Sequence, residues 1–273
     1  MASAAFDELN DPPEDAISSL EYHPLEPSVL LVASWDKTAR VYDTSANRLE
    51  TKVTHAAPVL DACFVGADGA RAASVGVDRG VRMITITLHT VASLGANLTS
   101  EQSQDAFALK FQTRALRCMP NGAGEPEQDR QLSSDYAICR HESVSCSVRI
   151  LRYAMSSIEG RIAIEYFDYS RESQAHRYAF KCHRETVDGV QMVYPINALA
   201  FNQLRSKTLK TELHGTLASG GADGLVNVWD SVSRRRVRQF RKFETGVSAL
   251  SFNCSGEQIA VGCSYTWEQG DKP

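Results

Sequence analysis

The chain has 273 residues, a net charge of −4 at neutral pH, 43% hydrophobic residues and 23% charged residues. This balance is typical of a soluble globular protein and excludes a largely disordered chain. No apolar run approaches the roughly 18 residues that a membrane-spanning helix needs. The acidic N-terminal segment contains neither a basic nor an apolar stretch, so we expect no secretory signal and a cytoplasmic or nuclear location. The negative net charge gives no general attraction for nucleic acid or anionic lipid.

The residues that could carry chemistry form no catalytic constellation. The seven cysteines are scattered and never form a Cys-x-x-Cys pair, which predicts thiols rather than disulfides. Cys139, His141 and Cys146 have a metal-like spacing, but a fourth ligand is lacking, so we expect no metal. Hydrolase, metalloprotease and nucleotide-binding motifs are absent from the sequence. We therefore expect a protein that is not an enzyme and that has no cofactor.

Four segments share one opening pattern, which indicates an internal repeat. Each has an apolar first residue, an apolar fourth residue and an aromatic sixth residue, and they lie at 17–22, 59–64, 196–201 and 247–252. The first two begin about 42 residues apart, the length of a four-stranded propeller blade. Second apolar segments that end in small residues follow, at 30–34, 72–76, 216–220 and 259–262.

Tight turns with an aspartate follow three of these second segments, at Asp36, Asp78 and Asp223. A third alternating segment comes next at 39–43 and at 226–230, where it ends in the Trp-Asp dipeptide that names WD40 repeats. Short, evenly spaced strands with Gly, Asp and Ser turns predict an all-β fold, a WD40 β-propeller. We interpret the aspartates as scaffold, because such a carboxylate accepts backbone N–H groups and a loop histidine, as His55 would provide for Asp78.

The middle of the chain interrupts the repeat. The pattern fades from about residue 88 to 154, and 125–149 is rich in charge and serine. At 156–167 a glycine turn precedes a clean alternating strand. We therefore predict N-terminal blades at 1–86, an irregular segment at 87–154 and open-ended C-terminal blades at 155–273. About four blades and part of a fifth are recognisable.

Several strings resemble one particular family of propellers. The most specific are SSIEGR at 156–161 and YAFKCHR at 178–184, with further similarity at 33–36, 110–114, 194–197, 220–230 and 264–271. Together they resemble the spindle-assembly-checkpoint propellers of the budding-uninhibited-by-benzimidazoles family. That family has seven blades, so the resemblance implies that blades and the closing strand are missing here. A gene model with skipped exons and a divergent natural isoform are the two explanations.

The resemblance implies a non-catalytic scaffold of the spindle assembly checkpoint, located in the nucleus and at kinetochores with a cytoplasmic pool. Its implied partners are checkpoint kinases, through a short glutamate-containing motif, and phosphothreonine motifs of a kinetochore scaffold protein, with ubiquitin as a further candidate. The alternative is a nuclear-pore-associated mRNA export factor of the same propeller family. We expect no membrane and no direct nucleic-acid partner.

Three cations are carried over from the family as binding residues. Arg161 would meet the glutamates of the kinase motif, because a guanidinium binds a carboxylate in bidentate geometry; its alternative is an ordinary turn arginine paired to a neighbouring blade. Arg184 and Lys181 would read the phosphate, whose charge suits clustered cations, although a merely solvated side chain is the alternative for Lys181. A further family cation falls near Arg205 or Lys207.

Two other features leave two interpretations each. Trp35 replaces the usual small or polar residue before the turn aspartate, and it is either an apolar anchor for a peptide or part of the packing between blades. The basic run at 234–242 either contacts nucleic acid or is a solvated outer strand protected by its charge. We favour the second interpretation, since the run alternates as an outer strand does.

Overall fold

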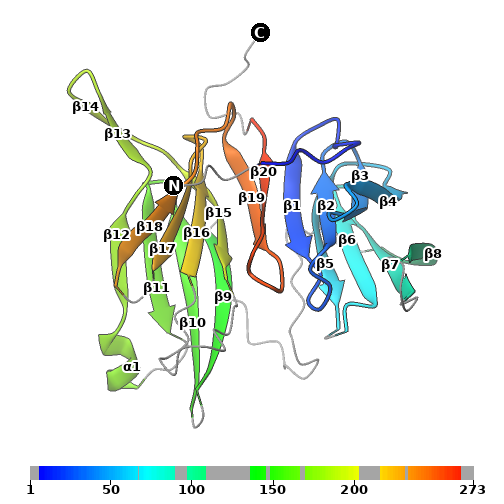
Figure 1. The fold of residues 1–273 in the computed structure, drawn as a ribbon, viewed down its shortest axis with the longest axis horizontal. Coiled ribbons are helices and arrows are strands. Elements are labelled where there is room, and N and C mark those ends of the chain that lie inside the picture. The colour runs from blue at the N-terminus through cyan, green and yellow to red at the C-terminus, as the bar shows by residue number, and fades with distance from the viewer. Residues whose placement is uncertain are drawn as a thin grey trace. The chain divides into compact units, whose positions relative to one another are not determined.

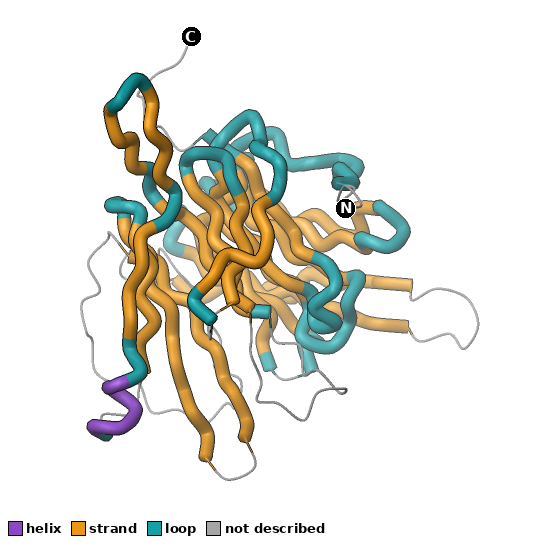
Figure 2. Tube along the Cα trace, turned by 60° about the vertical axis from the view of Figure 1, so that its left-hand side comes forward, coloured by secondary structure: helices purple, strands orange, loops and turns teal. Residues whose placement is uncertain are grey.

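The computed structural model describes residues 6–66, 68–89, 97–108, 136–145, 148–166, 170–202, 216–230 and 233–265. Within these ranges nearly all regular structure is β-strand, and α1 (Arg171–Ala175) is the one helix (Figure 2). The predicted all-β class is thereby confirmed. The chain divides into two compact units, Met1–Asp129 and Arg130–Pro273, called unit 1 and unit 2 below.

Unit 1 contains two four-stranded antiparallel sheets, with strand orders β1-β2-β3-β4 and β5-β6-β7-β8 (Figure 1). Its core consists of apolar side chains from both sheets, among them Leu31, Val41 and Phe64. The strands are β1 (Ile17–Tyr22), β2 (Val29–Ser34), β3 (Thr38–Asp43), β4 (Arg48–Thr54), β5 (Val59–Val65), β6 (Arg71–Gly76), β7 (Gly80–His89) and β8 (Asn97–Ala108).

Unit 2 contains two four-stranded antiparallel sheets, β12-β11-β10-β9 and β15-β16-β17-β18, a two-stranded sheet β19-β20 and the hairpin β13-β14. The hairpin extends beyond the end of β12 (Figure 1). The strands are β9 (Tyr136–Ser145), β10 (Val148–Ser157), β11 (Arg161–Tyr166), β12 (Tyr178–Lys181), β13 (Arg184–Val187), β14 (Val190–Val193), β15 (Ile196–Phe201), β16 (Thr216–Gly221), β17 (Val226–Asp230), β18 (Arg235–Gln239), β19 (Val247–Phe252) and β20 (Ile259–Cys263).

The repeat pattern predicts the blades well. The four predicted openings are β1, β5, β15 and β19, and the second and third apolar segments correspond to the strands that follow each opening. The described residues form four four-stranded sheets, the two-stranded sheet β19-β20 and the hairpin β13-β14, where the sequence predicts about four blades and part of a fifth. Strands β7, β8, β9 and β10 lie within or overlap 87–154, which the sequence pattern predicts to be irregular. The boundary between the units also falls in that segment.

Neighbouring blades of unit 2 approach closely where small residues end the second strand. A Cβ on Gly220 would overlap the side chain of Val247, so only glycine lets β16 lie this close to β19. A hydroxyl links another pair of sheets, since Ser156 Oγ donates to the carbonyl oxygen of Ile196 over 3.1 Å. Small and hydroxyl side chains therefore set the spacing between these blades.

The turn aspartate of unit 2 belongs to a buried polar chain. Both carboxylate oxygens of Asp223 lie 2.9 Å from His183 Nδ1, and His183 Nε2 lies 2.9 Å from Ser219 Oγ. Trp229 Nε1 donates to the same Ser219 oxygen over 2.8 Å. Because a carboxylate only accepts, His183 Nδ1 carries the proton and donates to Asp223. The chain of bonds joins the segment before the blade to its second and third strands.

The sequence-predicted partner of Asp78 lies beside it in unit 1, although the contact does not have hydrogen-bond geometry. His55 Nδ1 lies 3.3 Å from Asp78 Oδ2, and His55 Nε2 lies 2.8 Å from Ser74 Oγ. Burial lowers the pKa of His55, and the charge of Asp78 only partly opposes this effect. The histidine is therefore neutral at physiological pH and serves as a hydrogen-bonding scaffold.

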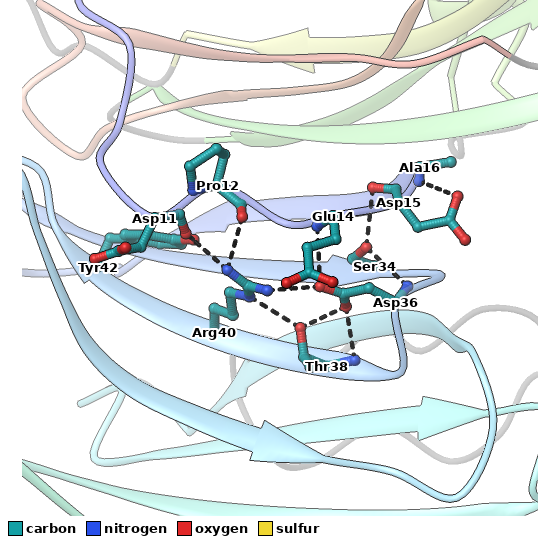
Figure 3. Close-up of polar contacts among 10 residues, drawn as sticks. All are labelled: Asp11, Pro12, Glu14, Asp15, Ala16, Ser34, Asp36, Thr38, Arg40 and Tyr42. Atoms are coloured by element: carbon teal, nitrogen blue, oxygen red, sulfur yellow. Dashed lines mark hydrogen bonds and ion pairs between the residues drawn. The ribbon is translucent and has the colours of Figure 1, made fainter.

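The first blade replaces the histidine with an arginine from its own third strand. Arg40 Nη2 lies 2.6 Å from Asp36 Oδ2, and both side chains are nearly inaccessible, at 4% and 9% exposed (Figure 3). Thr38 donates to the other carboxylate oxygen through its N–H group and its hydroxyl. We call this arrangement of Asp36, Thr38 and Arg40 the clasp.

The clasp also holds the N-terminal segment. Arg40 Nη1 donates to the carbonyl oxygens of Asp11 and Pro12 over 2.7 and 2.8 Å, and the Tyr42 hydroxyl donates to Asp11 over 2.7 Å (Figure 3). The N–H group of Glu14 completes the set by donating to Asp36 over 3.2 Å. One buried guanidinium thus fixes the turn and the segment that precedes β1.

We predict that Arg40→Met destabilises the protein by about 3 kcal/mol, because it leaves the Asp36 carboxylate buried without its cation. Urea denaturation of the two proteins measures this difference. Arg48→Ala is the matched control: Arg48 pairs with Glu50, but its side chain is 56% exposed, so its loss costs less than about 1 kcal/mol. Equal effects of the two substitutions would contradict the clasp as a stabilising unit.

The clasp also predicts how stability responds to acid. Burial by itself raises the pKa of Asp36, but hydrogen bonds from Thr38 and Glu14 and the charge of Arg40 outweigh it, so the pKa is lowered. A lowered pKa in the folded state contributes stability above the unfolded-state value of about 4, and this stability is lost as pH falls through the folded value. We expect the stability advantage of wild type over Asp36→Asn to shrink below about pH 4.

Urea titrations of wild type and Asp36→Asn at several pH values between neutrality and strong acid measure that advantage. Glu257→Gln removes an exposed carboxylate in unit 2 and is the control for general effects of charge. A difference in the free energy of unfolding between wild type and Asp36→Asn that stays constant over the whole pH range would refute the expectation.

Candidate peptide-binding site

Three of the four sequence-predicted binding residues come together in unit 2. Arg161 begins β11, Lys181 ends β12, and the two residues are direct partners in the register of this strand pair. Arg184 begins β13, three residues after Lys181. Like charges directly opposite one another in a sheet are unfavourable unless an anion lies near them. The arrangement therefore suits an anionic ligand.

Arg184 is half-buried and held by neutral acceptors. Its Nη2 donates to the carbonyl oxygen of Glu159 over 2.7 Å, and its Nη1 contacts Gln191 Oε1 over 3.3 Å. Within the described residues no carboxylate lies within ion-pair distance of this guanidinium. Its positive charge is oriented without being neutralised, and N–H groups on both terminal nitrogens remain for a ligand.

Arg161 is more exposed and only loosely paired. Its Nε lies 3.7 Å from Glu159 Oε2, with the two side chains 51% and 74% exposed. A pair this exposed and this long contributes little stability, so a carboxylate of a ligand could displace Glu159 at small cost. Arg161 therefore has the internal partner that its alternative interpretation expects, but the partner is a residue of the adjacent turn rather than of a neighbouring blade.

The turn before β11 connects these two arginines. Gly160 has φ 61°, and a Cβ there would lie 2.7 Å from the carbonyl oxygen of Cys182, so the turn packs tightly against the segment between β12 and β13. The N–H group of Cys182 donates to the Gly160 carbonyl over 3.0 Å. This contact brings the carbonyl of Glu159 to Arg184 and its carboxylate to Arg161.

The buried residues between Lys181 and Arg184 fix the backbone of the site. His183 has φ 47° and is bound to Asp223, so the strand direction changes at a residue held by the buried polar chain. Burial and the charge of Asp223 raise the pKa of the Cys182 thiol to about 12, although Arg184 opposes the shift. Cys182 therefore stays protonated and serves as packing.

A small pocket lies beside Arg161. The Ser157 hydroxyl oxygen in its wall is buried and has no hydrogen-bond partner among the described residues. The pocket combines two hydroxyls, one cation, one carboxylate and apolar side chains. It is lined by Met155, Ser156, Ser157, Ile158, Glu159, Arg161, Ala163 and Ala179.

Trp35 belongs to unit 1 and is described there by itself. It lies in the turn between β2 and β3, next to Asp36 of the clasp, and its N–H group donates to the carbonyl oxygen of Ala16 over 2.9 Å. Its side chain is 48% exposed. The backbone of this turn is thus fixed, whereas half of the indole surface remains open.

Some sequence-based candidates lie elsewhere or outside the described residues. Arg205 and Lys207 fall outside them, as do the side chains of Cys139, His141 and Cys146. In the part of the chain that the structure describes, no group of three metal-ligating side chains is found. No helix there is long and apolar enough to cross a membrane.

Sequence reasoning missed His183 and Glu159. His183 reads as part of the basic string, yet its place is in the scaffold, 40 residues before Asp223 because the hairpin β13-β14 and residues 203–215 intervene. Glu159 carried no sequence signal apart from its place in SSIEGR. The turn geometry alone brings its two oxygen-bearing groups to the two arginines.

Comparison with known proteins identifies the family. The profile of the WD domain, G-beta repeat family matches residues 8–43 and 177–230, which include Trp35, Lys181 and Arg184. The mitotic checkpoint protein BUB3.1 of Arabidopsis thaliana is 34% identical and covers 100% of this chain and 91% of its own length. The mitotic checkpoint protein bub3 of Dictyostelium discoideum is 32% identical, over 99% of this chain and 92% of its own length.

The mRNA export factor GLE2 of Chaetomium thermophilum is 25% identical, over 96% of this chain and 85% of its own length. The export propellers are thus similar along nearly the whole chain, but at lower identity than the checkpoint proteins. The chain therefore belongs to the BUB3 family of WD40-repeat mitotic checkpoint proteins.

Proposed function

We propose that this chain is a non-catalytic scaffold of the spindle assembly checkpoint that binds two kinds of acidic peptide. One is a short glutamate-containing motif of checkpoint kinases, and the other is a phosphothreonine motif of a kinetochore scaffold protein. The protein then acts in the nucleus and at kinetochores, with a cytoplasmic pool. The observation that carries the proposal is the cluster of Arg161, Lys181 and Arg184 around one turn.

Arg184 and Lys181 read the phosphate in this proposal. A phosphothreonine carries close to two negative charges and three acceptor oxygens at neutral pH. The guanidinium of Arg184 is oriented by two neutral acceptors, which supports a role in which its charge is left for a ligand. Lys181 is exposed and lies opposite Arg161, so it adds positive charge to the same location.

Arg161 meets the glutamates of the kinase motif, and Trp35 gives that motif an apolar anchor. The weak pairing of Arg161 with Glu159 supports the first role, because an incoming carboxylate replaces a partner of the same chemistry. The 48% exposure of Trp35 on a rigid turn supports the second role. Neither role involves a bond-breaking step.

The mRNA export function is the second candidate, since the GLE2 relatives align over nearly the whole chain. Their identity of 25% against 34% for the checkpoint relative favours the checkpoint role. The two functions differ in one measurable property. Only the checkpoint role, as proposed, requires that threonine phosphorylation of the bound peptide increases affinity.

We predict that Arg184→Ala weakens binding of a phosphothreonine peptide about 10- to 100-fold, because it removes charge-assisted hydrogen bonds to the phosphate. Calorimetric titration with phosphorylated and unphosphorylated copies of one peptide measures the effect. Arg171→Ala removes an equal charge from α1, which is exposed, and should leave affinity unchanged. Equal affinity of wild type for the phosphorylated and unphosphorylated peptides would refute the proposed checkpoint function of this site.

For Arg161 we predict a specific coupling to a glutamate of the peptide. Arg161→Ala should lower the affinity for a glutamate-containing peptide about tenfold. Arg161→Lys should restore only part of this affinity, because lysine lacks the bidentate geometry. Replacing the peptide glutamate with glutamine should make wild type and Arg161→Ala nearly equal in affinity. A double-mutant cycle tests this, and additive effects would mean that the two side chains do not meet.

A further inference from the structure

Strand β18 forms an exposed cationic edge in unit 2, at a place that the peptide-binding cluster does not use. It is the last strand of its sheet and pairs with β17 alone in the described part of the chain. All five of its residues are exposed, and Val237 in the middle is 63% exposed. Six of the nine residues at 234–242 are arginine or lysine.

The fourth strand of the first blade is a useful contrast. In β4, Val53 is buried, several residues are half-buried, and Arg48 forms an ion pair with Glu50. That edge mixes positive and negative charges and is partly covered, as edges that avoid pairing usually are. By comparison the side chains of β18 are exposed along its whole length and its charge is of one sign, with a β-bulge at Val237.

The guanidinium groups of this edge are held by neutral partners. Arg234 lies over the ring of Tyr178 at 4.3 Å, and Arg238 lies over the ring of Phe240 at 4.7 Å. Arg236 Nη1 is 3.5 Å from Asn227 Oδ1. Contacts with aromatic rings and an amide orient these cations but leave their charge in place.

The geometry favours an extended polypeptide over a nucleic acid as the partner. An edge strand presents backbone N–H and C=O groups along its open side, and these pair with another strand. Bases would need aromatic faces for stacking, yet the rings of Tyr178 and Phe240 are already covered by guanidinium groups. The exposed Val237 adds an apolar contact that suits a neighbouring strand.

We propose that β18 is a docking edge for an acidic, extended polypeptide segment that adds to the sheet as a further strand. A β-bulge at Val237 places Arg236 and Arg238 on opposite faces of the sheet, so neighbouring glutamate or aspartate side chains of that segment, one on each face, meet the two arginines while its backbone pairs with β18. The same arginines repel a second copy of this edge and so prevent self-association. This surface is distinct from the site of Arg161, Lys181 and Arg184. The proposal for β18 therefore does not depend on the function proposed for that site.

The test uses the full chain and a fluorescein-labelled peptide that repeats Glu-Glu-Val-Thr, so that glutamates point to both faces of the added strand. Fluorescence anisotropy should show binding that weakens as salt increases. A copy with alternate backbone nitrogens methylated should bind at least about tenfold more weakly, since each lost hydrogen bond contributes. A copy with lysine in place of glutamate should not bind.

The variant Arg236→Glu/Arg238→Glu should bind the acidic peptide at least about tenfold more weakly than wild type, because two attractive charge interactions become repulsive. Arg171→Glu/Arg177→Glu makes the same change of charge at exposed positions on and just after α1, and should bind as wild type. Arg236→Gln/Arg238→Gln is a milder version that keeps the test decisive if the charge reversal does not fold. Binding of the phosphothreonine peptide should be the same in all of these variants and in wild type.

Three results would overturn the proposal. Equal binding of the methylated and unmethylated peptides would exclude strand addition. An equal loss of peptide affinity in the Arg171→Glu/Arg177→Glu control would show that the effect comes from net charge and not from the position of β18. Tighter binding of a single-stranded oligonucleotide than of the acidic peptide, lost in the same β18 variant, would assign the edge to nucleic acid.

Discussion

The buried carboxylate of the turn aspartate is the interaction on which the rest of the structure depends. In three blades its Oδ1 accepts the N–H group two residues later, at Thr38, Gly80 and Leu225, over 2.9, 3.1 and 3.1 Å. The residue between has a positive φ in each case. A carboxylate removed from water needs further donors, and the partner that each blade supplies decides which other segment becomes fixed.

The choice of partner links the scaffold to the residues of the proposed binding site. His183 satisfies Asp223 and, because it lies between Lys181 and Arg184, it also fixes the backbone that carries both cations. Arg40 satisfies Asp36 and thereby fixes the turn that carries Trp35. A side chain on such a turn loses little backbone freedom when a ligand binds, which lowers the entropic cost of association. Rigidity at the proposed site thus follows from a buried polar network.

Local patterns predicted the strands, whereas partners that depend on tertiary structure were only partly predictable. The apolar and aromatic positions of β1, β5, β15 and β19 follow one pattern, and His55 lies at the spacing from Asp78 that a single loop gives. The same reasoning did not predict His183, because the hairpin β13-β14 and residues 203–215 lengthen the sequence separation between His183 and Asp223. Arg40 escaped because its carbonyl acceptors at Asp11 and Pro12 meet it only in the folded blade.

In the proposed function, the net charge of −4 has a consequence for how acidic peptides reach this protein. Long-range attraction is absent, and at physiological ionic strength charges farther apart than about 8 Å are largely screened. Selection of a phosphate or a glutamate must therefore occur at contact distance, where the positions of a few guanidinium groups decide the outcome. Arg161 and Arg184 meet that condition because one turn holds both, through the carboxylate and the carbonyl of Glu159. Affinity at this site is then governed by geometry, and a loosened turn would weaken it even with every charge retained.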